Sequence, residues 1–138
     1  MRAFGLSCLV FALTSAFPAE VRKCAVCGME FSQGSKTSYE ATIEGKALPL
    51  CSFQCAVRTH RKYPTAKLEA FDFMTGKRVP VETAFFLAKS KNLLSEVEFG
   101  MAPTIVAFAD KKSAESTNSR LGDGTVVQGF SRLEKLYE

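Results

Sequence analysis

The sequence has a single histidine, no tryptophan and no cluster of aspartates and glutamates in its 138 residues. Without a carboxylate cluster, we expect no site for a hard cation. The net charge is only +4, and no basic run is interleaved with aromatic residues, so nucleic acid is not an expected partner. The sequence also shows no grouping of base, nucleophile and oxyanion donors, and we therefore expect no enzyme activity.

Two residues that an enzyme or a metal site could use have simpler interpretations. His60 follows Cys55 by five residues on a predicted helix, which turns it away from that cysteine, so we expect it to pack rather than bind metal. Asp72 could serve as the acid of an enzyme that cleaves carbon–metal bonds, but it is a lone carboxylate. A thiol oxidoreductase would need a helix directly after Cys24 and Cys27, and irregular chain is expected there instead.

The N-terminus resembles an export signal. Arg2 precedes an apolar run from Ala3 to Phe17, which is too short for a comfortable membrane span but typical of a secretory signal. We assign residues 1–19 to a signal peptide, with cleavage after Ala16 or Ala19. The mature chain is then periplasmic with no membrane span, or membrane-anchored if the signal is retained.

Four of the 5 cysteines lie beyond this signal, in the first half of the mature chain. They are Cys24, Cys27, Cys51 and Cys55. Disulfides within the two pairs would close loops too short to restrain much unfolded chain, whereas thiolates at this spacing are typical ligands of soft metals. We expect metal capture, with an oxidised resting state as an alternative.

The hydrophobic pattern predicts an α+β fold of two small strand–helix–strand modules, about residues 20–75 and 76–138, related by possible duplication. Expected strands cover residues 37–43, 47–51, 68–73, 104–108 and 125–128. Expected helices follow the N-cap Ser52 up to Tyr63, span residues 81–90, and run from Asp110 to Leu121. A last helix is expected to begin with a capping box of Ser131 and Glu134. Cys55 falls in the first turn of its helix, where the dipole is expected to lower its pKa.

Two separated motifs resemble the NosL family of exported copper-binding accessory proteins, from about Cys24 to Phe130. Cys27, Gly28 and Met29 match the family's cysteine–any–methionine signature, and the segment 100–103 resembles its Gly-Met-rich second motif. The resemblance implies a periplasmic metallochaperone that serves the copper sites of nitrous oxide reductase in denitrification. It also implies that Cys27, Met29 and Met101 hold Cu(I), and that the partner is a client copper protein or its assembly machinery.

The residues agree with this ligand set. Cys27 and Met29, two apart in an expected extended segment, would point to the same side, and Gly28 would let another backbone approach. Together with Met101 they would form a three-coordinate sulfur site that suits Cu(I) and allows ligand exchange.

The cysteine pattern also resembles small heavy-metal-binding YHS or TRASH-type modules. In that interpretation Cys24, Cys27, Cys51 and Cys55 close a tetrahedral Zn(II) site that stabilises a binding domain, and the methionines only pack. The sequence leaves Cys24 open between the copper and zinc sites.

Overall fold

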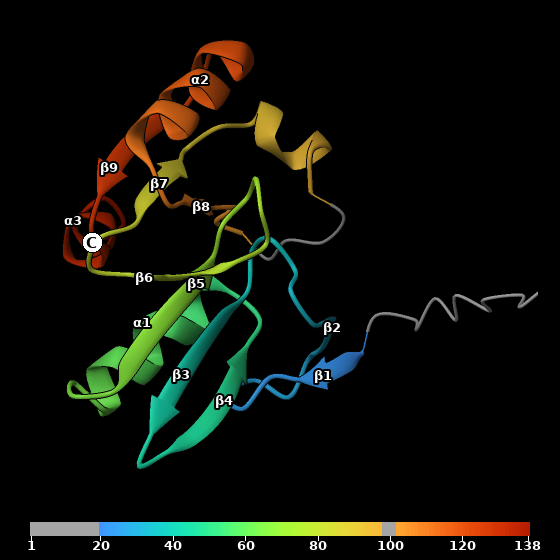
Figure 1. Cartoon of the computed structure of the whole chain (residues 1–138), viewed down its shortest axis with the longest axis vertical. Helices are drawn as coiled ribbons and strands as arrows, with labels where there is room; N and C mark the ends of the chain where they lie inside the picture. Colours follow the sequence, from blue (N-terminus) through green and yellow to red (C-terminus); the bar gives the residue numbers. More distant parts are fainter. Residues whose placement is uncertain (1–19, 98–101) are drawn as a thin grey trace, which may run out of the picture.

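The computed structural model describes residues 20–97 and 102–138. The expected signal peptide and Met101 therefore lie outside the described residues. The described part of the chain contains no helix long and apolar enough to cross a membrane. Two antiparallel sheets lie one beyond the other along the long axis of the molecule, and a short hairpin is attached to the first (Figure 1).

The hairpin consists of β1 (Val21–Lys23) and β2 (Glu30–Ser32), which pair antiparallel with Arg22 opposite Phe31. The segment that joins the two strands contains the first cysteine pair. Phe31 is buried and belongs to the core that also contains Cys24. The hairpin is therefore packed against the body of the protein by an apolar side chain rather than held only by its own two strands.

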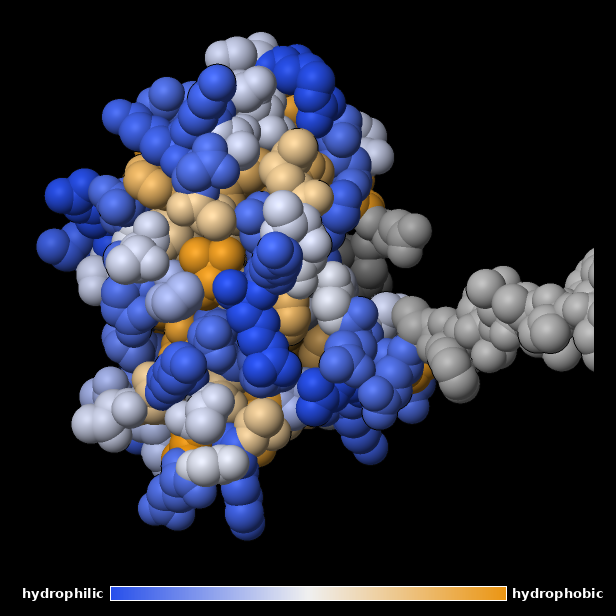
Figure 2. All heavy atoms as spheres, in the orientation of Figure 1, coloured by the Kyte–Doolittle hydropathy of each residue, from blue (hydrophilic) through white to orange (hydrophobic). Residues whose placement is uncertain are grey.

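The first sheet has the strand order β4-β3-β5-β6. Its strands are β3 (Tyr39–Ile43), β4 (Lys46–Leu50), β5 (Lys67–Phe71) and β6 (Arg78–Pro80). Helix α1 (Phe53–Lys62) covers one face, and the Ser52 side chain accepts a hydrogen bond from the Cys55 N–H, which confirms the predicted N-cap. The face toward the viewer is largely hydrophilic with scattered apolar residues (Figure 2).

The second sheet has the order β8-β7-β9. It contains β7 (Phe85–Ala88), β8 (Val106–Phe108) and β9 (Thr125–Gln128). A short 3-10 helix, η1 (Asn92–Ser95), follows β7, helix α2 (Lys111–Leu121) joins β8 to β9, and α3 (Phe130–Lys135) comes last. The predicted bounds of α2 are confirmed, because Asp110 caps its start and Gly122, at φ +81°, ends it.

Two of the predicted helix features are wrong. Residues 81–90 contain strand β7, whose Phe86, Leu87 and Ala88 are all 0% exposed. A central strand buried on both faces produces a continuous apolar run, and such a run is hard to tell from a buried helix by periodicity. Helix α3 starts at Phe130, one residue before Ser131, with Gly129 as its N-cap and no side-chain cap. The backbone N–H of Phe130 donates to the Val81 carbonyl instead.

Part of the connectivity is common to both sheets: two antiparallel strands, then a helix, then a strand that pairs with the first of the two. The first sheet adds a fourth strand, β6, and a longer segment with η1 joins β7 to β8. The two sheets are joined where the Phe73 N–H donates to the Ala107 carbonyl at 2.8 Å. The larger hydrophobic cluster contains residues from both sheets, and Phe130 stacks edge-on against both Tyr39 and Phe53. The α+β architecture is confirmed, while the duplication and its boundary near residue 75 stay predictions.

Candidate metal centre

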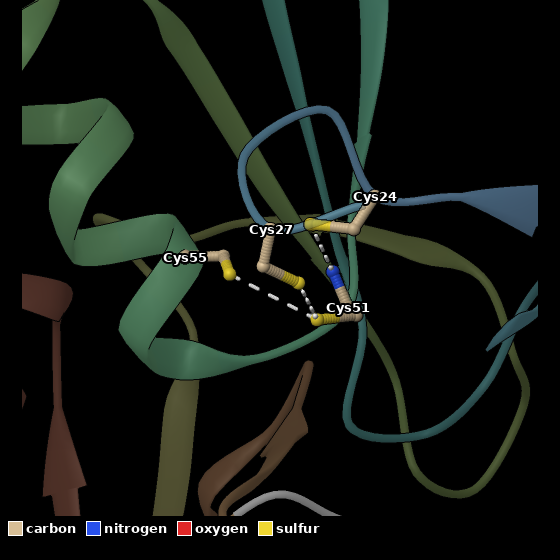
Figure 3. A group of neighbouring side chains, drawn as sticks. All are labelled: Cys24, Cys27, Cys51 and Cys55. Atoms are coloured by element: carbon tan, nitrogen blue, oxygen red, sulfur yellow. Dashed lines mark hydrogen bonds between the residues drawn. The ribbon is translucent and has the colours of Figure 1, made fainter. Parts of the chain in front are cut away.

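Four cysteine sulfurs converge at one end of the first sheet. The Sγ atoms of Cys24, Cys27, Cys51 and Cys55 all lie within 4.8 Å of one another (Figure 3). Cys27 Sγ is 3.4 Å from Cys51 Sγ, which in turn is 3.8 Å from Cys55 Sγ. A tetrahedral site with metal–sulfur bonds of about 2.3 Å has sulfur–sulfur edges of about 3.8 Å. The spacing therefore suits four ligands of one metal ion.

Cys24 and Cys27 lie in the turn between β1 and β2. The Cys24 N–H donates to the Met29 carbonyl at 2.8 Å and the Gly28 N–H donates to the Cys24 carbonyl at 3.0 Å. Gly28 has φ +76°, a conformation that a side chain disfavours, so glycine permits this turn to close. The extended segment expected around Cys27 is therefore wrong: backbone hydrogen bonds fold residues 25–27 into a turn.

Cys51 and Cys55 are held by the junction of β4 and α1. Cys51 directly follows β4, and Cys55 sits in the first turn of α1. The Ala25 N–H donates to the Pro49 carbonyl at 2.9 Å, which ties the first cysteine turn to β4. The Cys51 N–H also points to Cys24 Sγ at 3.5 Å. These bonds bring together two cysteine pairs that are separated by 24 residues or more in the sequence.

The four thiols differ sharply in exposure. Cys24, Cys51 and Cys55 are 3%, 1% and 2% exposed, whereas Cys27 is exposed. A metal ion bound by all four sulfurs would be held by three buried cysteines and would be accessible to solvent only beside Cys27.

The local backbone favours ionisation of Cys24. Burial works against the charged form, but hydrogen bonds from backbone N–H groups of Cys27, Cys51 and Val26 outweigh it and lower the pKa of the thiol to about 7. A substantial fraction of Cys24 is thus a thiolate near neutral pH. The thiolate is the form of cysteine that binds metal.

The other two buried thiols resist ionisation. Burial raises the pKa of Cys51 above its ordinary value, and contact with Cys27 adds to this. Burial likewise raises the pKa of Cys55 to about 11, so the expected lowering by the helix dipole is wrong, because desolvation is the larger effect here. Both thiols must release protons when a metal binds, which couples metal affinity to pH.

Ser52 has a role that the sequence pattern indicated only in part. Its hydroxyl is buried, accepts the Cys55 N–H at 3.4 Å, and also lowers the pKa of both Cys51 and Cys55 by hydrogen bonding. Its position directly after Cys51 and three residues before Cys55 is the signal for this second role. Ser52 therefore orients two candidate ligands as well as capping α1.

The remaining candidates are not among the four clustered sulfurs. Met29 is half-buried against the same core, and Met101 lies outside the described residues. His60 packs edge-on against Phe130, with Nδ1 3.6 Å from Glu134 Oε1, as expected for a packed histidine. Asp72 is buried and its Oδ1 accepts the Met74 N–H at 2.9 Å, so it has the structural role of closing a turn.

The fold resembles a solved structure. The chain matches the crystal structure of the copper chaperone NosL from Shewanella denitrificans with a TM-score of 0.60 and 19% sequence identity, over 78% of this chain and 86% of that one. No protein-family model matches the sequence, and no curated protein does either. The shared fold agrees with the family resemblance of the cysteine and methionine motifs.

Proposed function

We propose that this chain is an exported accessory protein that binds Cu(I) through cysteine thiolates and passes it to a partner copper protein. The observation that carries the proposal is the convergence of four sulfurs of which only Cys27 is exposed. A thiolate site selects soft metals, and Cu(I) is satisfied by fewer sulfur ligands than Zn(II). The fold likeness to a protein described as a copper chaperone supports the same choice.

The candidate ligands are Cys24, Cys27, Cys51 and Cys55 together with the thioethers of Met29 and Met101, of which Cu(I) would bond to three or four at a time. The pKa of Cys24 is lowered to about 7, so this thiol would hold the ion as a thiolate near neutral pH. Support for Met101 comes from its neighbour: the Ala102 carbonyl accepts a hydrogen bond from Gln54 Nε2 at 3.1 Å, and Gln54 directly precedes Cys55. This contact ties the second motif to the start of α1.

Transfer is proposed to occur at Cys27. A sulfur of the partner would approach the exposed side of the centre, bond to the copper ion, and replace Cys27 while the three buried sulfurs still hold it. Stepwise replacement keeps Cu(I) bound throughout, so no free ion is released. The motifs that resemble NosL make nitrous oxide reductase, or its assembly machinery, the proposed client, and the N-terminal apolar run supports delivery in the periplasm.

Zinc is the second candidate, and the sulfur spacing is the observation that favours it. The sulfur–sulfur separations of 3.4 and 3.8 Å approach the edge of a tetrahedral zinc site, about 3.8 Å. In that case the metal would stabilise the fold and the chelated protein would unfold. The large hydrophobic core, which includes residues from both sheets, argues for a fold that does not depend on metal.

The test is an anaerobic titration of the reduced chain, started at Glu20, with Cu(I) against a competing chelator and with Zn(II) in parallel. We expect a preference for Cu(I), a loss of at least about tenfold in Cu(I) affinity for Cys27→Ser, and smaller losses for Met29→Leu and Met101→Leu. Met74→Leu is the matched control, since Met74 is 62% exposed and lies outside the proposed ligand set.

Three outcomes would change the proposal. Methionine variants that bind Cu(I) as tightly as the Met74→Leu control would remove the thioethers from the ligand set. A preference for Zn(II), combined with unfolding on chelation, would favour the structural zinc site. A chain that binds neither metal tightly would overturn the proposed function.

A further inference from the structure

We propose that a groove along the outer side of α1 receives an acidic segment of the client, with an apolar side chain at its centre. This inference rests on the proposed delivery of copper to a client protein. The groove has a volume of about 390 Å³, and α1, Pro103 and the C-terminal residues Glu134 and Tyr137 line it. No cysteine lines it, but Gln54, one of its lining residues, directly precedes Cys55 in α1.

The rim of the groove is basic. Arg58 and Arg61 are both exposed and both line it. Within residues 20–97 and 102–138, neither guanidinium lies within ion-pairing distance of a carboxylate, and α1 itself contains no acidic residue. Two unpaired guanidinium groups one helical turn apart can each hold a carboxylate with two hydrogen bonds. The complementary partner is therefore acidic.

The floor of the groove is apolar. Phe53 and Val57 line it from α1, and Tyr137 lines it from the C-terminus. The rings of Phe53 and Tyr137 are 5.3 Å apart, and both Val57 and Tyr137 are half-buried. An apolar or aromatic side chain could cover this surface while flanking carboxylates reach the arginines. This combination favours a peptide segment over a small anion such as phosphate.

One acidic residue also borders the groove and decides where the acidic part of a bound segment can lie. Glu134 lines the groove, and its Oε1 lies 3.6 Å from His60 Nδ1. A carboxylate of the partner would be repelled near Glu134 and attracted toward Arg58 and Arg61. The acidic part of the segment is therefore expected to lie over the α1 side rather than over α3.

The position of the groove would bring a docked client close to the site of copper transfer. Gln54 lines one end and is followed directly by Cys55. Pro103 lines the same groove, and the Gln54 side chain bonds to the adjacent Ala102 carbonyl. A client segment seated along α1 would thus hold the client beside the first turn of that helix, where the sulfur cluster lies (Figure 3).

The probe is a blocked, fluorescent heptapeptide with a central phenylalanine and three glutamates on each side, measured by fluorescence polarisation on the chain from Glu20. We expect binding that weakens between about 50 and about 200 mM salt, because the contact is electrostatic. Arg58→Glu combined with Arg61→Glu is expected to weaken it at least about tenfold. A peptide with glycine in place of phenylalanine should also bind more weakly.

The matched control is Lys46→Glu combined with Lys112→Glu, which makes the same change in net charge on exposed residues away from the groove. Peptide binding that is undetectable up to about 1 mM would overturn the proposal. An equal loss in both double variants would also overturn it, because attraction would then follow net charge alone. Tighter binding of inorganic phosphate than of the peptide at Arg58 and Arg61 would replace the peptide by a small anion.

The Cu(I) titration separates this inference from the proposed function. Neither arginine belongs to the sulfur cluster, so the Arg58→Glu, Arg61→Glu variant is expected to bind Cu(I) as the parent chain does. If the parent chain binds the peptide but not Cu(I), copper delivery is refuted and the peptide-binding groove still stands. If the parent chain binds Cu(I) but not the peptide, the docking role of the groove is refuted and copper binding still stands.

Discussion

Cys27 Sγ lies 3.4 Å from Cys51 Sγ, so the exposed thiol of the centre is in contact with its most enclosed one. The two residues come from different elements, the turn after β1 and the end of β4. The Ala25–Pro49 hydrogen bond holds these elements together. The same contact can serve a metal ion in the reduced chain or a disulfide in the oxidised chain.

Oxidised glutathione is expected to convert the metal-free chain to a form with a Cys27–Cys51 disulfide. Cys27 is the thiol that solvent reaches, and its sulfur would move from 3.4 Å to about 2.05 Å from that of Cys51. The glutathione disulfide bond breaks, the protein disulfide forms, and two molecules of reduced glutathione leave. Mass spectrometry of non-reduced peptides would identify the bridge, and the oxidised chain should bind Cu(I) more weakly until it is reduced.

The control for this prediction is Cys55→Ser, which should still form the bridge, because Cys55 lies farther from Cys51 at 3.8 Å. A dominant bridge between Cys24 and Cys27 would contradict it and would show that the turn opens before it oxidises.

The stability of the reduced, metal-free chain is expected to depend on pH through its thiols. The pKa of Cys24 is lowered from 9.0 to about 7, so its ionisation stabilises the folded chain above the unfolded pKa, and this contribution is lost as pH falls through about 7. Cys51 and Cys55 have raised pKa values, so their contribution is lost as pH rises above 9.0. Urea unfolding should show stability that rises from pH 7 to 9 and then falls.

Cys24→Ser should remove the rise in stability between pH 7 and 9, while the fall in stability above pH 9 should remain. A rise of the same size in this variant would mean that another group, not Cys24, ionises in that range.

Glu40→Ala is expected to destabilise the chain by about 2 kcal/mol, because it removes the charged contacts that a buried carboxylate makes with the partly exposed Arg22 and Arg78. Glu40 is 3% exposed, with its carboxylate 3.1 Å from Arg78 and 3.5 Å from Arg22. Arg22 stands two residues before Cys24, so Glu40→Ala should also weaken metal binding. Urea unfolding measures the first effect and Cu(I) titration the second.

The comparison variant is Glu115→Ala, which removes an exposed pair with Lys111 and should cost less than about 0.5 kcal/mol. Equal losses of unfolding free energy in Glu40→Ala and Glu115→Ala would show that burial does not make the Glu40 ion pairs more stabilising than an exposed pair.

Gly124→Ala is expected to destabilise the second sheet by about 1–3 kcal/mol through overpacking. A Cβ at this position would lie 2.6 Å from Leu87 Cδ1 and 2.8 Å from Asn118 Oδ1. Leu87 is 0% exposed and has little room to move. Thermal unfolding should be measured for Gly124→Ala, for Leu87→Ala and for the double variant. The double variant should lose less unfolding free energy than the two single variants lose in total. Additive losses would argue against a clash with Leu87.

Local chemistry allowed the sequence to determine several features. The Ser52 cap and the whole of α2, from its Asp110 cap to Gly122, depend on hydrogen bonds between residues close in the chain, so their signals are local. The four cysteines similarly indicated a soft-metal site by residue type alone. The α+β class followed from the alternation of such elements.

Tertiary structure decided the rest. Residues 85–88 form a strand because β8 and β9 pair with them on both sides, and no local pattern encodes those neighbours. The pKa of Cys55 rises because the folded core removes water, which outweighs the local helix dipole. Cys27 meets Cys51 because a turn bonds to a distant strand. Residue chemistry thus indicated a soft-metal site, while contacts between distant segments decided which sulfurs meet and which one is exposed.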